Sequence, residues 1–199
     1  MMLPLLAPAQ TVSFGVKGGV PGQTPLGSTD DRIPFVVGPT IDFRIDPRLS
    51  IESGVLFDRL GQQNGTLAFT NQDNSLTLVD TRQTARAVEV PILAKVHLLS
   101  GKRTWRPFVA AGPTIRHTSV DSNYASSVFG GTSLAQLNQP LFLNSTQSKW
   151  NVDPAAGIGV DVRAGRFHLE PEVRYSYWGA GKTMNLRKNQ VAFLLGFRL

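Results

Sequence analysis

Bulky apolar residues alternate with polar or small residues along most of the chain. The last stretch, residues 189–199, shows this most clearly: every second position from Val191 to Leu199 is bulky and apolar, and Gln190, Gly196 and Arg198 stand between them. Side chains of a strand point alternately to its two faces, so this period of two predicts a strand with one apolar face.

The same period recurs in seven further stretches, separated by segments rich in Gly, Pro, Asn, Asp and Ser that favour turns and loops. The predicted strands cover residues 11–20, 35–45, 51–58, 86–98, 105–116, 150–162, 167–177 and 189–199. Short alternating pieces with turn signals between residues 61 and 85 predict that the third and fourth strands continue into a hairpin. Residues 118–149 are polar and without clear period, which predicts a long irregular loop.

The connections alternate in length along the chain. Short turns at residues 46–48, 100–104 and 164–166 follow the second, fourth and sixth strands, and long connections follow the others. This alternation is typical of a membrane barrel with short turns at one rim and long loops at the other. We therefore expect an all-β protein, a closed up-and-down antiparallel transmembrane β-barrel of about eight strands, with both termini at one rim.

The period alone leaves open which face lies inside, because a soluble lipocalin-like barrel shows the same alternation with its apolar face inward. Two features of the polar face favour a polar lumen. Nearly every strand carries a glycine there, which makes room for long side chains, and acids and bases occur in equal number, which suits enclosed ion pairs. The acids are Asp42, Glu52, Asp58, Glu89, Asp153, Asp161, Glu170 and Glu172; the bases are Lys17, Arg44, Lys95, Arg106, Arg116, Arg163, Arg174 and Arg198.

The other face is apolar and carries aromatic residues near the strand ends, which predicts belts at the two membrane interfaces. These residues are Trp105, Trp150, Phe167, Tyr175, Tyr177 and Phe197. Four large apolar residues fall on the polar face instead: Leu56, Leu93, Phe108 and Leu194. They predict either apolar packing inside the lumen or bulges that shift the strand register.

The composition argues against nucleic-acid binding. The formal charge of +6 comes from basic residues spread singly along the chain, without the basic cluster of a nucleic-acid-binding protein. The chain contains no cysteine. Ala7-Pro8-Ala9 fits the pattern before a signal-cleavage site, so we expect residues 1–9 to be a signal-peptide remnant and residues 10–199 to be the barrel domain.

Sequence motifs for catalysis or cofactor binding are few. No phosphate-binding loop, zinc-protease motif or nucleophile elbow occurs, and we expect no cofactor and no metal site. His97 and His168 lie on the polar face, where we expect them to pair with Glu89 or Glu170. The weak catalytic candidates are His117 and Ser119, at the outer end of the fifth strand.

Residues 88–95 (VEVPILAK), residues 108–113 (FVAAGP) and the terminal strand carry a family resemblance. Over residues 11–199 the chain resembles the small outer-membrane β-barrel proteins, such as the OmpA membrane domain, OmpX and the PorT-like group. The resemblance implies a monomer in the bacterial outer membrane that contacts outer-membrane lipids including lipopolysaccharide, and that contacts the barrel-assembly machinery through residues 189–199. It implies a non-enzymatic structural, adhesion or envelope/export-docking role.

Two alternatives remain at this point. The His117-x-Ser119 spacing resembles the PagL-like lipid A deacylases, in which the serine attacks an acyl ester with the histidine as its base. A soluble lipocalin-like ligand-binding barrel is the other.

Overall fold

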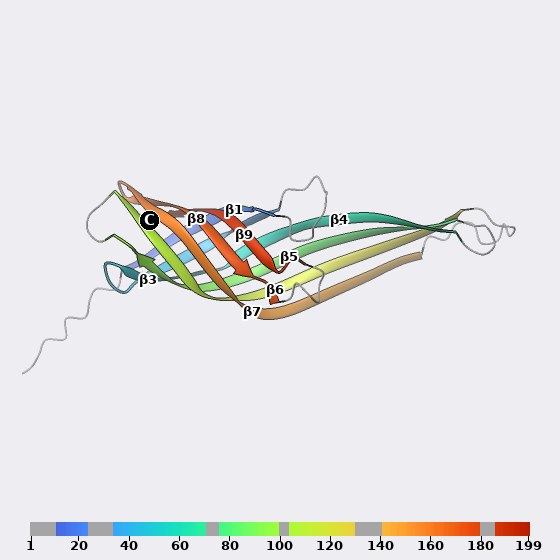
Figure 1. Ribbon diagram of the computed structural model, residues 1–199, viewed down its shortest axis with the longest axis horizontal. Helices are drawn as coiled ribbons and strands as arrows, with labels where there is room; N and C mark the ends of the chain where they lie inside the picture. Colours follow the sequence, from blue (N-terminus) through green and yellow to red (C-terminus); the bar gives the residue numbers. More distant parts are fainter. Residues whose placement is uncertain (1–10, 24–33, 71–75, 100–103, 130–140, 180–185) are drawn as a thin grey trace, which may run out of the picture.

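The fold is known from a computed structural model, which describes residues 11–23, 34–70, 76–99, 104–129, 141–179 and 186–199. Its strands are β1 (Thr11–Pro21), β2 (Phe35–Arg44), β3 (Leu49–Gly54), β4 (Leu56–Thr70), β5 (Leu76–His97), β6 (Trp105–Phe129), β7 (Leu141–Ala164), β8 (Phe167–Tyr177) and β9 (Asn189–Arg198). Figure 1 shows them as a barrel from which β4–β7 project on one side. Within the described residues, no helix has the length and apolarity to cross a membrane.

Backbone pairing closes the barrel. All pairings are antiparallel: apart from β3 and β4, each strand pairs with its neighbours in the chain, and β1 pairs with both β2 and β9. β3 and β4 are two parts of one strand: both pair with β2, and Val55 between them still donates its N–H to Pro39 O at 3.0 Å. The ring therefore has eight strand positions, and the predicted closed up-and-down barrel is confirmed.

Two of the predicted short turns lie at the rim where the described chain begins and ends. In the β2–β3 turn the Asp46 carboxylate accepts the N–H groups of Arg48 and Leu49, at 2.6 and 2.8 Å. In the β7–β8 turn Gly165 has a φ of 66°, a left-handed conformation that glycine adopts without a steric cost. Residues 100–103, in the third predicted turn, and the predicted signal-peptide remnant lie outside the described residues.

Burial alternates along the strands as predicted. On β8, Glu172 is 3% exposed whereas its neighbour Val173 is 39% exposed. All the apolar-face aromatic residues predicted to form belts are exposed, from Tyr177 at 39% to Trp150 at 67%. The apolar face therefore points outward and the charged face inward, which is opposite to the lipocalin-like alternative.

The four large apolar residues on the polar face pack inside the lumen and mark no bulge. Phe108 is 1% exposed, and glycine makes its space: a Cβ on Gly159 would lie 2.5 Å from its ring. Gly157 leaves room for the Glu172 carboxylate in the same way, with a hypothetical Cβ at 2.6 Å. At Gly38 a Cβ would collide with the backbone oxygen of Val55, so this glycine permits close approach of two strands.

The predicted loop at residues 118–149 is wrong in its larger part. β6 stays paired with β7 as far as Ser126 and Leu141, and β4 stays paired with β5 as far as Thr70 and Leu76, as predicted for that hairpin. The outer halves of β4–β7 form a four-stranded sheet, here called the extension, that projects beyond the barrel (Figure 1). Backbone hydrogen bonds hold the extension together. Because polar side chains occur on both of its faces, the sequence shows no period of two there from which strands could be predicted.

A bulge marks the point where β4 leaves the barrel. The β4–β5 register shifts between Arg59 and Gly61, and Gly61 has a φ of 108°. The extra residue is Leu60, which is only 3% exposed. A bulge of this kind bends the strand and increases its twist, which accounts for the change of direction at this rim.

Candidate functional site

The lumen contains a network of ion pairs centred on Glu52 of β3. Its carboxylate accepts Lys17 Nζ of β1 and Lys95 Nζ of β5, both at 2.5 Å, and Arg174 Nη2 of β8 at 2.8 Å. All four side chains are at least 95% buried. Three cations from separate strands therefore compensate one carboxylate, and the remaining charge is taken up by its neighbours.

Glu170 and Glu172 each have their own cations. Glu172 contacts Arg174 at 2.6 Å and Lys17 at 2.7 Å, and Glu170 contacts Lys95 and Arg198, both at 2.8 Å. The two carboxylates are two residues apart on one face of β8, as the sequence indicated. Their role is to extend an ion-pair ladder across β1, β5, β8 and β9.

Asp161 organises the rim at which the chain ends. It accepts Arg106 Nη2 at 2.5 Å and contacts His168 Nδ1 at 2.6 Å and His97 Nε2 at 3.6 Å. The predicted pairing of both histidines with Glu89 or Glu170 is therefore wrong, because the strand register brings each ring to Asp161. The described residues contain no cluster of His, Asp and Glu arranged to hold a metal ion.

One predicted lumen base lies outside the network. Arg163 follows the inward parity of β7, but it stands at the rim, is exposed, and donates its Nε–H to Gly165 O at 3.3 Å. The parity places a side chain on a face but leaves its height in the barrel undetermined. The other predicted lumen charges face inward.

An apolar cap covers the ion pairs at the other end of the lumen. Arg116 pairs with Glu89 and, at 2.8 Å, with Asp153, and its guanidinium lies 3.9 Å from the ring centroid of Trp178. The cap residues pack around this tryptophan: Leu60, Ala85, Ala87, Val120, Trp178 and Leu186, all at most 6% exposed. A cavity beside the cap, lined in part by Leu56 and Trp178, has a volume of about 50 Å³, space for only a few water molecules.

The cap was not foreseen from the sequence, although one signal was present. Trp178 extends the inward parity of Arg174 and Ser176 by one more step. Leu186 precedes the start of β9 at Asn189, in a segment predicted as loop, so no strand period marks it. Burial of both residues follows from the tertiary packing against β4, β5 and β6.

His117 and Ser119 both lie on the outward face of β6, within the strand rather than at its end. His117 is paired with Val88 and Trp150, and its ring centroid lies 4.6 Å from that of Trp150. Ser119 is paired with Arg86 and Ser148. None of these four positions carries a carboxylate, and Asp121, on the same face, is four residues from His117, about 13 Å along a strand.

Comparison with known proteins decides the family. The sequence profile described as outer membrane protein beta-barrel domain matches residues 8–182. The chain belongs to this family. No curated protein sequence matches it.

Several solved outer-membrane barrels are similar in structure. Neisserial surface protein A (NspA) is 15% identical with a TM-score of 0.52, and 94% of this chain and 95% of that one are covered. The N-terminal barrel of Pseudomonas aeruginosa OprF is 12% identical with a TM-score of 0.49, covering 94% of both chains. Ail, the attachment invasion locus protein of Yersinia pestis, is 11% identical with a TM-score of 0.38, covering 96% and 97%.

As a bacterial outer-membrane β-barrel, the protein places its outward apolar face in the lipid. Along β5 and the residue that follows it, the outward residues are apolar from Val88 to Leu98, about the 9–11 residues that a tilted strand needs to cross a bilayer. Beyond Val88 they become Arg86, Thr84 and Arg82. Outer-membrane barrels typically turn their short connections to the periplasm and their long ones outward, so we expect the extension to lie outside the cell.

Replacing the central carboxylate tests the lumen network. Glu52→Gln removes the charge on which Lys17, Lys95 and Arg174 converge, and we expect it to lower the free energy of unfolding in detergent by about 3–5 kcal/mol, because buried cations lose their compensation. Asp80→Asn is the matched control, since Asp80 makes an exposed contact with Thr66 at 2.6 Å in the extension. We expect the control to change stability by at most about 0.5 kcal/mol. Urea titration followed by tryptophan fluorescence measures both; equal stability of Glu52→Gln and the control would contradict a buried network.

Proposed function

We propose that the protein is a non-enzymatic, non-conducting outer-membrane barrel whose role is to hold the extension away from the membrane as an adhesion surface. The observation that carries this proposal is the length of β4–β7 beyond the barrel. From Gly61 to Thr70, β4 alone reaches about 30 Å past the bulge. A barrel that served only as a membrane anchor would have no use for such an ordered sheet.

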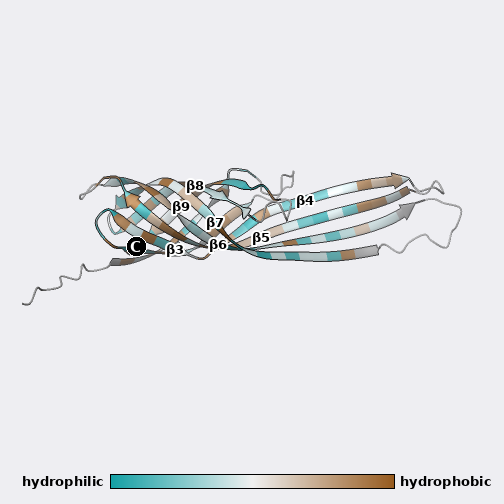
Figure 2. Cartoon of the chain, turned by 60° about the horizontal axis from the view of Figure 1, so that its bottom comes forward, coloured by the Kyte–Doolittle hydropathy of each residue, from teal (hydrophilic) through white to brown (hydrophobic). Residues whose placement is uncertain are grey.

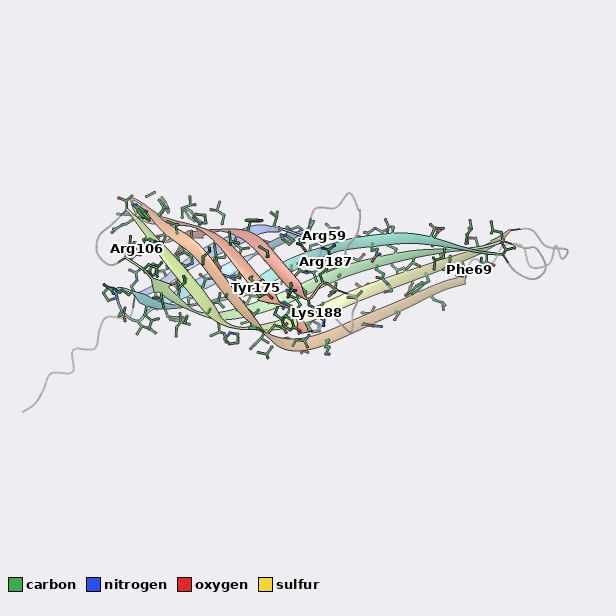
Figure 3. All side chains as sticks on the ribbon, viewed as in Figure 1. Arg59, Phe69, Arg106, Tyr175, Arg187 and Lys188 are labelled. Carbon is green, nitrogen blue, oxygen red and sulfur yellow. The ribbon has the colours of Figure 1, made fainter. Side chains whose placement is uncertain are left out.

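Exposed apolar side chains near the tip of the extension support a contact role. Leu67, Phe69 and Leu143 are 58%, 51% and 55% exposed. Their register places all three on the face that continues the lumen wall. Figure 2 shows hydrophilic residues over much of the extension and hydrophobic ones toward its tip, and Figure 3 labels Phe69 there. Exposed apolar groups on one face of an ordered sheet favour a protein or surface partner.

The closed lumen argues against transport. The ion pairs of Glu52 and the apolar cap around Trp178 fill the lumen at successive heights. An eight-stranded barrel is also about the size at which interior side chains fill the space. We further propose outer-membrane lipids including lipopolysaccharide as its lipid partner, the barrel-assembly machinery as a partner of residues 189–199, and a monomeric state.

Shortening the extension separates adhesion from barrel formation. In the variant, Asn-Gly turns replace residues 63–83 and 122–145, which joins Gln62 to Thr84 and Asp121 to Thr146 at paired positions and leaves the cap intact. We expect the variant to reach the outer membrane and to show heat-modifiable gel mobility like the full chain. We expect it to lose the self-agglutination and the adherence to polystyrene that the full chain confers on cells.

Two results would contradict this function. One is unchanged adherence: cells with the shortened variant adhere as strongly as cells with the full chain, or cells with the full chain adhere no more than empty-vector cells. The other is stepwise ion conductance of the purified full chain in a planar bilayer, which the filled lumen predicts to be absent.

The PagL-like deacylase is the alternative that His117 and Ser119 keep open. A serine needs an oriented histidine base, and the positions directly paired with His117 are Val88 and Trp150. We therefore expect lipid A from cells expressing the protein to have the same mass spectrum as lipid A from empty-vector cells. If lipid A loses one hydroxyacyl chain in cells with the wild-type protein but keeps it in cells with Ser119→Ala, the protein is a deacylase.

A further inference from the structure

Two arginines stand side by side at the outer end of the barrel. Arg59 of β4 and Arg86 of β5 occupy directly paired positions. Both follow the outward parity of Phe57 and Val88 and point away from the lumen. Within the described residues neither guanidinium has a hydrogen-bond or ion-pair partner. Like charges directly opposite on neighbouring strands are destabilising, so this pair lacks the anion that would compensate it.

The strand register places this pair relative to the last apolar outward residues of β4 and β5. One row of outward positions, linked by successive pairings, runs through Phe57, Val88, His117 and Trp150. Phe57 and Trp150 in this row are 52% and 67% exposed, as expected of an aromatic belt at the headgroup level. The next row outward runs through Phe35, Arg59, Arg86, Ser119 and Ser148, about 7 Å further along the strands. Along β4 and β5, the two arginines therefore lie one outward step beyond Phe57 and Val88.

A hollow of about 810 Å³ opens on the outward face at the same level. Arg59, Arg82 and Arg86 line it together with polar side chains that include Asn123 and Asn144. Arg82 is held by Gln62, whose Oε1 accepts its Nη2–H at 2.9 Å. Two acids also line the hollow: Asp121, which accepts the Thr146 hydroxyl at 2.9 Å, and Asp58, which follows the inward parity of Leu56.

We propose that Arg59 and Arg86 form a binding site for a phosphate group of outer-leaflet lipopolysaccharide. This inference deepens the lipid-partner part of the proposed function. Planar guanidinium groups bind phosphate oxygens in a bidentate manner, and two of them at paired positions can hold one phosphate between them. A lipid whose acyl chains pack against Phe57 and Val88 brings its headgroup phosphate to these two arginines, whereas a free phosphate ion gains nothing from the apolar residues beside them. Figure 3 places Arg59 at the junction of barrel and extension, with Arg187 and Lys188 nearby in the view.

Binding of defined lipids to the purified full chain in detergent tests the site. The ligands are bisphosphorylated lipid A, the same lipid after phosphatase treatment, and inorganic phosphate alone. The variant Arg59→Gln/Arg86→Gln is compared with Arg163→Gln/Arg166→Gln, which removes two exposed arginines from the opposite rim and gives the same change of charge. Affinity is measured by the quenching of tryptophan fluorescence and by the rise in unfolding temperature.

We expect bisphosphorylated lipid A to bind the wild type and the control variant alike, and to bind the Arg59/Arg86 variant roughly tenfold more weakly for each lost charge-assisted contact. Without lipid, the Arg59/Arg86 variant should be at least as stable as the wild type, because a repulsive pair is gone. Equal binding by all three proteins, an equal loss in both variants, or undiminished binding of the dephosphorylated lipid would overturn the site. Stabilisation by inorganic phosphate as large as that by lipid A would overturn the lipid assignment in favour of the free ion. None of these results depends on adherence or conductance, so failure here is distinct from failure of the surface function.

Discussion

Buried charge in the lumen is the constraint on which the rest of the structure depends. A carboxylate or ammonium group inside a narrow barrel is tolerated only beside an opposite charge, and around Glu52 every such partner comes from another strand. Glu52 of β3 needs Lys17 of β1, Lys95 of β5 and Arg174 of β8 at hydrogen-bonding distance. A slip of one residue in any of these strands would turn its charge into the lipid and leave the partners uncompensated, so the network fixes the register and requires closure.

Closure in turn explains the division of the molecule into two parts. Within the barrel every strand has two neighbours, one face in lipid and one in the lumen. Past the bulge at Gly61 the remaining strands β4–β7 have water on both sides, and the ion pairs give way to the apolar cap around Trp178. The cap seals the lumen where the ring opens, and the paired strands continue outward as a sheet. The proposed adhesion surface and the proposed phosphate site both begin at this transition.

The barrel could be predicted from the sequence because each of its strands faces lipid on one side and the polar lumen on the other. Apolar outward positions and polar inward positions impose a period of two that is legible residue by residue, as on β8 from Phe167 to Tyr177. Even the lumen location of Leu93 and Phe108 followed from parity, once the alternative of a bulge was excluded. The extension at residues 118–149 was missed because strands with water on both faces need no such period. The partners of His97 and His168 were missed because contacts between inward side chains of different strands depend on the stagger of the strands, and the cap was missed because Leu186 lies outside any strand.

The outward face of the barrel lies in lipid, and along β7 we place the boundary with water at the exposed Trp150. The chain has no cysteine, so single cysteines along β7 can carry nitroxide labels without background. Val152, Ala156, Ile158 and Val160 are outward positions of the barrel, and Thr146 and Ser148 are outward positions beyond Trp150. In membranes, spin-label relaxation should show the first four labels accessible to oxygen and protected from a water-soluble nickel reagent, with the reverse at 146 and 148. Equal nickel accessibility at all six positions would contradict the account.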